Sequence, residues 1–192
     1  IYNSTTGRFE VYDGAAWHGR VRLDGDTMTG DLTVTKGTGT ATGRVSNVLN
    51  VNTTSQATTG TSEEVLATYT LPANTLSANG KAIRVTAWGT TAANTNTKVV
   101  SLRFGGIGGT LLVNRGGIST SGAIWRISSE IVRTGAATQE ASGMSAVGAS
   151  CSGHSASPTQ TLSGTVDIVV TGTTSTSAGD VTFKGLIVEA LN

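Results

Sequence analysis

Apolar and polar residues alternate along most of the second two-thirds of the chain, with the two-residue period of β-strands. Eight such runs lie between residues 63 and 192, separated by segments rich in Gly, Asn and Ser, and no helical period appears between them. This spacing predicts an all-β fold, a jelly-roll-like antiparallel β-sandwich. The runs cover residues 64–71, 81–88, 98–104, 110–114, 123–133, 139–146, 159–171 and 180–191.

Two of these runs carry apolar residues on both faces. In the second run, Trp88 lies on the face opposite to Ile83, Val85 and Ala87. The last run is expected to place Val181, Phe183 and Ile187 on one face, and Leu186 and Val188 on the other. A single sandwich core covers only one face of a strand, so the second face must meet a subunit or another layer. The pattern therefore favours an oligomer.

The first residues have the pattern of a small hairpin. Residues 8–12 alternate strictly, the turn dipeptide Asp13-Gly14 follows, and Trp17 comes next. A two-stranded hairpin is marginal alone in water, so we expect a neighbouring copy of the chain to cover it. Because Ile1 already lies inside this hairpin, we expect the chain to be a fragment of a longer parent protein.

Three segments follow from these patterns. Residues 1–35 form the hairpin segment, residues 36–62 a connector rich in Gly, Thr and Ser, and residues 63–192 the sandwich. One short apolar group interrupts the connector and predicts a strand laid against its neighbours: Val45, Val48, Leu49 and Val51.

Composition and charge support strands and exclude some partners. Charged residues make up 13% of the chain, with Thr the commonest residue and 26 glycines, which favours strands and turns over exposed helices. The net charge is +1 with no basic stripe, and aromatic residues are 5%, so we expect no nucleic-acid partner. No apolar run approaches the roughly 20 residues that would span a membrane.

No catalytic constellation is visible, and we expect neither an enzyme nor a cofactor. Cys151 is a lone cysteine without a Cys-His pattern around it, so a small loop residue is the simpler interpretation. Paired carboxylates for glycoside hydrolysis would need two acidic residues a few ångströms apart, which sequence alone cannot place. The candidates are Glu63, Glu64, Glu130, Glu140, Asp167, Asp180 and Glu189.

For carbohydrate binding, the useful residues are an exposed aromatic ring and polar loop residues. Trp88 heads a loop that contains Asn94 and Asn96, and these three are the candidate ligand-binding residues. The alternative for Trp88 is packing in a subunit interface. Trp125 shares a face with Ile127 and is expected in the core.

Two motifs near the beginning of the chain resemble elements of bacteriophage and prophage fibre proteins. Residues 2–17 match the pattern YNxxTGxxExYDGxxW, and residues 25–32 match GxTMTGxL. Where many such fibres carry consecutive glycines, this chain has Asp24, Gly25 and Asp26. Together the two motifs cover under a fifth of the chain.

The resemblance implies a homotrimer with a short intertwined N-terminal fibre shaft and a C-terminal knob, located on the virion. Its partners would be its own copies, other virion proteins, and a bacterial surface glycan or other host receptor. Alternatives are a capsid-mounted head fibre or decoration protein, a small polysaccharide hydrolase or deacetylase, and a secreted carbohydrate-binding module.

A fibre axis could also gather metal ligands, but no metal site is expected. A three-fold axis could bring together one copy of His18 or His154 from each chain, although a solvated or hydrogen-bonded imidazole is the simpler reading of both. Asp24, Asp26 and Asp31 invite a calcium site but lack the spacing of a calcium-binding loop, so they fit turn and shaft carboxylates better.

Overall fold

The computed structural model describes residues 2–3, 8–12, 17–19 and 47–191, and the chain divides into two compact units, residues 1–44 and 45–192. In the first unit, β1 (Tyr2–Asn3), β2 (Arg8–Tyr12) and β3 (Trp17–Gly19) form a three-stranded antiparallel sheet. Val11 lies opposite His18 in the β2–β3 pairing, which confirms the predicted hairpin. The predicted turn at Asp13-Gly14, the shaft element at residues 25–32 and the carboxylates of Asp24, Asp26 and Asp31 lie outside the described residues.

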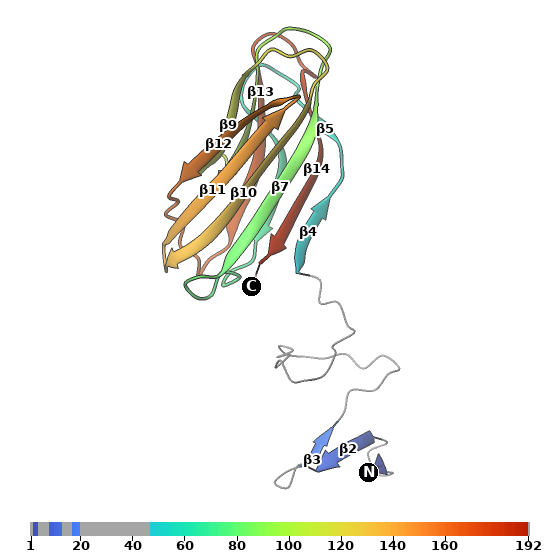
Figure 1. The fold of residues 1–192 in the computed structure, drawn as a ribbon, viewed down its shortest axis with the longest axis vertical. Helices are drawn as coiled ribbons and strands as arrows, with labels where there is room; N and C mark the ends of the chain where they lie inside the picture. The colour runs from blue at the N-terminus through green and yellow to red at the C-terminus, as the bar shows by residue number, and fades with distance from the viewer. Residues whose placement is uncertain (1, 4–7, 13–16, 20–46, 192) are drawn as a thin grey trace. The chain divides into compact units, whose positions relative to one another are not determined.

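The second unit consists of two antiparallel sheets that pack face to face (Figure 1). The large sheet has the order β12-β11-β10-β7-β14-β4, with the short β5 also pairing with β14. The small sheet has the order β6-β13-β8-β9. None of the described residues belongs to a helix that is long and apolar enough to cross a membrane.

The strands of the large sheet are β4 (Val48–Asn52), β5 (Gln56–Ala57), β7 (Ala82–Thr91), β10 (Ile124–Gly135), β11 (Thr138–Val147), β12 (Ser150–Ala156) and β14 (Val181–Ala190). Those of the small sheet are β6 (Glu64–Leu71), β8 (Lys98–Phe104), β9 (Thr110–Ile118) and β13 (Val166–Thr174).

Most of the predicted runs are strands, and the differences have clear causes. β4 forms on the apolar group of the expected connector, so the sandwich unit includes strands from residues 36–62. β12 was not predicted, because its Ser, Gly and Ala residues give no apolar alternation. The run expected from residue 159 begins as a strand only at Val166.

The core lies between the two sheets and takes its largest side chains from both. Trp125 and Phe183 of the large sheet and Phe104 of the small sheet are fully buried there. Ile83, Val85 and Ala87 face the core while Trp88 does not, as the alternation of β7 predicts. Trp125 is a core residue, as expected.

The face assignment expected for the last strand is wrong. A β-bulge in the pairing of β14 with β7, between Phe183 and Gly185, shifts the alternation by one residue. As a result Leu186 and Val188 lie in the core with Phe183, and Ile187 points away from it. The last strand therefore has one fully apolar face and a single large apolar residue on the other.

The centre of the large sheet depends on a glycine. Gly89 of β7 is paired with Trp125 on one side and with Phe183 on the other. The Trp125 ring lies against the Gly89 backbone, where a Cβ atom would come 2.5 Å from the ring and 1.9 Å from the Thr182 carbonyl oxygen. The indole N–H donates to the Thr90 carbonyl oxygen at 3.2 Å, which satisfies the polar end of this buried side chain.

Gly89→Ala should lower the free energy of unfolding by about 1–3 kcal/mol, because the added methyl group overpacks a site closed by backbone and an aromatic ring. Gly153→Ala is the matched control, since a Cβ atom at this glycine of β12 meets nothing within 4 Å. Urea denaturation of the two variants checks the prediction. Equal effects of the two substitutions would contradict it.

Candidate functional site

The outer face of the large sheet, which points away from the core, carries an unusual share of exposed apolar side chains. Among the described residues, seven large hydrophobic residues are exposed, and four of them lie here: Ile124 (69%), Val51 (60%), Met144 (57%) and Val48 (42%). Strand register places them, because directly paired residues point to the same side of a sheet. Val51 is paired with Ile187 and Met144 with Ser128, while Ile124 alternates with the buried Trp125.

The outer face of the small sheet differs from this. There the Arg103 guanidinium holds the Glu63 carboxylate with two hydrogen bonds, Nε–Oε1 at 2.9 Å and Nη2–Oε2 at 3.1 Å. The Thr171 hydroxyl donates to the same carboxylate at 2.7 Å. The hydrogen bonds from Arg103, and to a lesser extent from Thr171, outweigh burial and lower the pKa of Glu63. This face thus carries a paired polar cluster beside one exposed large apolar side chain, Val65.

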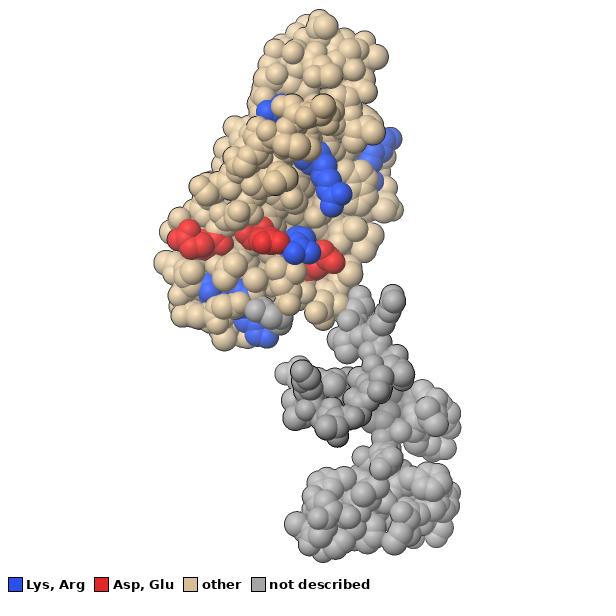
Figure 2. Space-filling view, viewed as in Figure 1, with Lys and Arg blue, Asp and Glu red and all other residues tan. Residues whose placement is uncertain are grey.

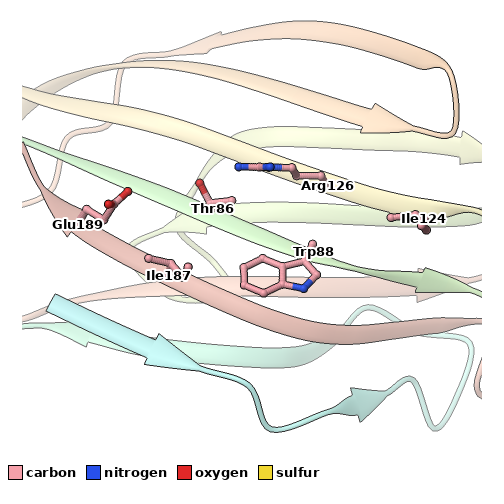
Figure 3. Close-up of a pocket in the computed structure, with 6 residues that line it drawn as sticks. All are labelled: Thr86, Trp88, Ile124, Arg126, Ile187 and Glu189. Atoms are coloured by element: carbon pink, nitrogen blue, oxygen red, sulfur yellow. The ribbon is translucent and has the colours of Figure 1, made fainter. Parts of the chain in front are cut away.

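A groove of about 500 Å³ lies on the outer face of the large sheet (Figure 3). Its lining residues, here called the Trp88 groove, are Thr86, Trp88, Ile124, Arg126, Ile187 and Glu189. The Trp88 indole lies across β14 on the backbone of Gly185, where a Cβ atom would come 2.2 Å from the ring. Arg126 reaches the groove from β10, and Ile187 and Glu189 reach it from β14 (Figure 3).

Both signs of charge occur on this face. Arg84 and Glu130 form an ion pair with Nη2–Oε1 at 2.8 Å, and this hydrogen bond and charge raise the pKa of Arg84. Arg126 makes no hydrogen bond or ion pair with the residues that the structure describes. Glu189 accepts no hydrogen bond from them, but it lies opposite Arg84 in the strand pairing, and its charge also raises the pKa of Arg84. Figure 2 shows acidic and basic side chains gathered in a band across the lower part of this face, with further basic side chains above and below it.

A second arrangement of polar residues lies at the end of the sandwich opposite to the start of β4. The distal loops, residues 92–97 and 175–180, meet there (Figure 1, top). Asp180 and Lys98 are almost completely buried, at 1% and 0% exposure. Asn94 Nδ2 donates to Asp180 Oδ1 at 2.6 Å, and Asn96 Nδ2 donates to Oδ2 at 2.8 Å. The Lys98 ammonium donates to the carbonyl oxygens of Asn94 at 3.0 Å and Asn96 at 2.8 Å.

This network keeps Asp180 ionised. Burial alone would raise the pKa of the carboxyl, but the hydrogen bonds from Asn94 and Asn96 and the charge of Lys98 together lower it below its ordinary value. The backbone adds two further contacts: Thr97 N–H donates to Ser175 Oγ, and Ser175 N–H donates to the Thr97 carbonyl oxygen. The distal loops are thereby fixed to each other before any ligand arrives.

The structure separates the three candidate ligand-binding residues. Trp88 lines the groove on the sheet face, whereas Asn94 and Asn96 lie in a distal loop with their amides turned to Asp180. Their role in ligand binding stays a prediction. Sequence reasoning did not single out Arg126, Ile187 or Glu189 for this groove, because only strand register brings them beside Trp88.

Two other side chains that could take part in catalysis, Ser145 and His154, contact each other. Ser145 Oγ lies 2.9 Å from His154 Nε2, but Ser145 is completely buried, so its hydroxyl is closed to an external substrate. Burial and the charge of Arg115 lower the pKa of His154. Cys151 is exposed. No group of three or more possible metal ligands occurs within the described part of the chain.

Six of the seven acidic residues considered for hydrolysis accept hydrogen bonds from separate partners, and Glu189 accepts none from the described residues. Besides Glu63, Glu130 and Asp180, three more accept hydrogen bonds: Glu64 from Thr59 and Gly60, Glu140 from Ser157, and Asp167 from Thr70. No two of these carboxylates share a hydrogen-bonding partner among the described residues.

Comparison of the chain with protein-family models, with curated proteins and with solved structures gives no match.

The stabilising effect of Asp180 should depend on pH. Because its folded pKa is lowered, its contribution is fully present above the unfolded pKa of about 3.9 and is lost as the pH falls through the folded value. Asp180→Asn should therefore destabilise the protein most at neutral pH, and the difference from the natural protein should shrink below about pH 4. Urea denaturation at pH 7, 5 and 3 measures it. A difference that stays constant over this range would contradict the prediction.

Proposed function

We propose that this chain is a non-enzymatic structural and adhesive part of a bacteriophage or prophage fibre, working as a homotrimer on the virion. The resemblance of residues 2–17 and 25–32 to fibre shaft motifs supports the family. The main support for assembly into an oligomer comes from the outer face of the large sheet. Four of the seven exposed large apolar side chains among the described residues lie on this face, which favours its burial between copies.

Strand connectivity supports a jelly-roll-like knob. Between β6 and β14 the chain passes repeatedly from one sheet to the other, so that β7 lies between β10 and β14 and β13 lies between β6 and β8. Such crossings between two antiparallel sheets are typical of jelly rolls. The extra strands β11 and β12 extend the large sheet beyond β10.

The positions of the start of β4 and the end of β14 give the sandwich a direction in the proposed fibre. The Ala190 N–H donates to the Asn47 carbonyl oxygen at 2.7 Å, so the chain enters β4 and leaves β14 at the same end of the sandwich. The distal loops lie at the other end. In the proposed fibre they face the host surface, and they are already ordered by the Asp180 network, which lowers the entropic cost of binding.

The exposed side chains of the distal end suit a neutral polysaccharide. Most of them are hydroxyl-bearing or small: Ala93, Thr95, Thr97, Ser119, Thr120, Ser121, Ser175, Thr176, Ser177 and Ala178. Hydroxyl groups donate and accept hydrogen bonds, and so match the hydroxyl groups of sugars. We therefore place carbohydrate recognition at this end of the knob.

In light scattering the purified chain should have a mass near three times 19.4 kDa. The trimer follows from burial of the apolar outer face of the large sheet between copies. A monodisperse monomer at all concentrations would contradict the proposal.

Binding should be sensitive to the distal loops. Ala93→Arg places a bulky charged side chain in a distal loop, whereas Ala78→Arg makes the same change in the exposed loop between β6 and β7 at the opposite end. On a panel of immobilised bacterial surface polysaccharides, we expect the first variant to weaken binding by about tenfold or more and the second to leave it unchanged.

Three outcomes would change this conclusion. No binding by the natural protein to any polysaccharide would favour a capsid-mounted fibre with a structural role. New reducing ends or released acetate would favour a hydrolase or deacetylase. Equal loss in both arginine variants would move the binding site away from the distal loops.

A further inference from the structure

No described strand or loop of the second unit covers the apolar outer face of the large sheet, and the features of this face point to one kind of occupant. We infer that the Trp88 groove is a contact between copies of this chain, in which Arg126 of one copy pairs with Glu189 of the next. This inference rests on the proposed homotrimer and deepens it, because it names the surface and the residues that join the copies.

The extent of the surface argues for a macromolecule. The exposed apolar residues of this face lie between Val51 on β4 and Met144 on β11, with Ile124 and the half-buried Ile187 between them. Adjacent strands are about 4.8 Å apart, so this span across five strands is on the order of 20 Å. A single sugar ring covers only part of it. Another sheet face, by contrast, packs over such a surface with interdigitating side chains.

The charges argue for a second copy of the same chain. Arg126 is exposed and has no hydrogen bond or ion pair among the described residues. Glu189 lines the same groove and accepts no hydrogen bond from them, and its one charged neighbour, Arg84, already forms an ion pair with Glu130. Apolar contact on Ile124 and Trp88 would remove both charges from water, which costs free energy unless each meets an opposite charge. A polyanion or a polycation could neutralise only one of them. A second copy supplies both.

In a ring of three copies, every Arg126 and every Glu189 has a partner of opposite charge on a neighbouring copy. Glu189 lies on β14 and Arg126 on β10, on the two sides of β7. In a closed heterologous ring, each copy presents Arg126 to one neighbour and Glu189 to the other, so every copy makes both contacts. The Trp88 indole, resting on Gly185, then forms part of the apolar floor between the paired charges.

This arrangement assigns Trp88 to assembly. The alternative that the sequence left open, a sugar stacked on this ring, needs the groove to stay accessible. If the copies pack here, carbohydrate recognition is left to the distal loops.

A charge swap tests the pairing. Arg126→Glu and Glu189→Arg each place like charges opposite one another, and each should raise the dissociation constant of the assembly about tenfold or more. The double variant restores opposite charges and should return close to the natural value. Sedimentation over a dilution series gives the constants, with the absorbance of the tryptophans as the signal.

Two further variants control the experiment. Lys184→Glu changes the charge of β14 by the same amount at the exposed bulge outside the groove, and should leave assembly unchanged. Ile124→Asp changes a side chain that is 69% exposed, so it should spare the fold and weaken assembly. Thermal unfolding of the dissociated chains checks that every variant folds.

The outcomes separate the inference from the proposed function. A natural protein of three-copy mass in which the double variant does not recover would overturn the Arg126–Glu189 pair and leave the trimer standing. Unchanged assembly of Ile124→Asp would overturn the groove as the contact surface. A two-copy mass would overturn the ring. A natural protein that stays monomeric would contradict the homotrimer itself.

Discussion

The contact between Trp125 and Gly89 at the centre of the large sheet is the constraint on which most of the second unit depends. The fully buried Trp125 ring occupies the space that a side chain at position 89 would need, so this packing requires the glycine of β7. Truncating such a ring to alanine typically costs about 3–5 kcal/mol. The contact between the ring and the glycine also fixes the register of β10 on β7. A slip of one residue would point every core side chain of β10 towards the solvent.

The same device recurs on the opposite face of the same sheet. Trp88 is the residue before Gly89, and its ring lies on Gly185 of β14. The bulge before Gly185 makes this possible, because it keeps Phe183 and Leu186 in the core while setting the glycine beneath the indole. The two tryptophan–glycine contacts therefore lock β10, β7 and β14 together from both sides, and the groove is a by-product of that packing.

Much of this fold could be predicted from local patterns, and what could not be predicted depends on partners distant in sequence. Alternation identified β7 and the core position of Trp125, because the side-chain period is a property of each strand alone. The bulge that moves Ile187 to the outer face is absent from any such pattern. Likewise Asn94 and Asn96 have the composition of ligand-binding loop residues, yet their amides are bound to a carboxylate 86 and 84 positions further along the chain.

The buried Lys98 ammonium has a consequence for where this protein can work. Carbonyl oxygens from one loop and a nearby carboxylate are the ligands with which many proteins hold a calcium ion. Here the cation is covalently part of the chain, so it can be neither diluted nor chelated away. The order that it gives to the distal loops is therefore independent of the free divalent-ion content of the medium.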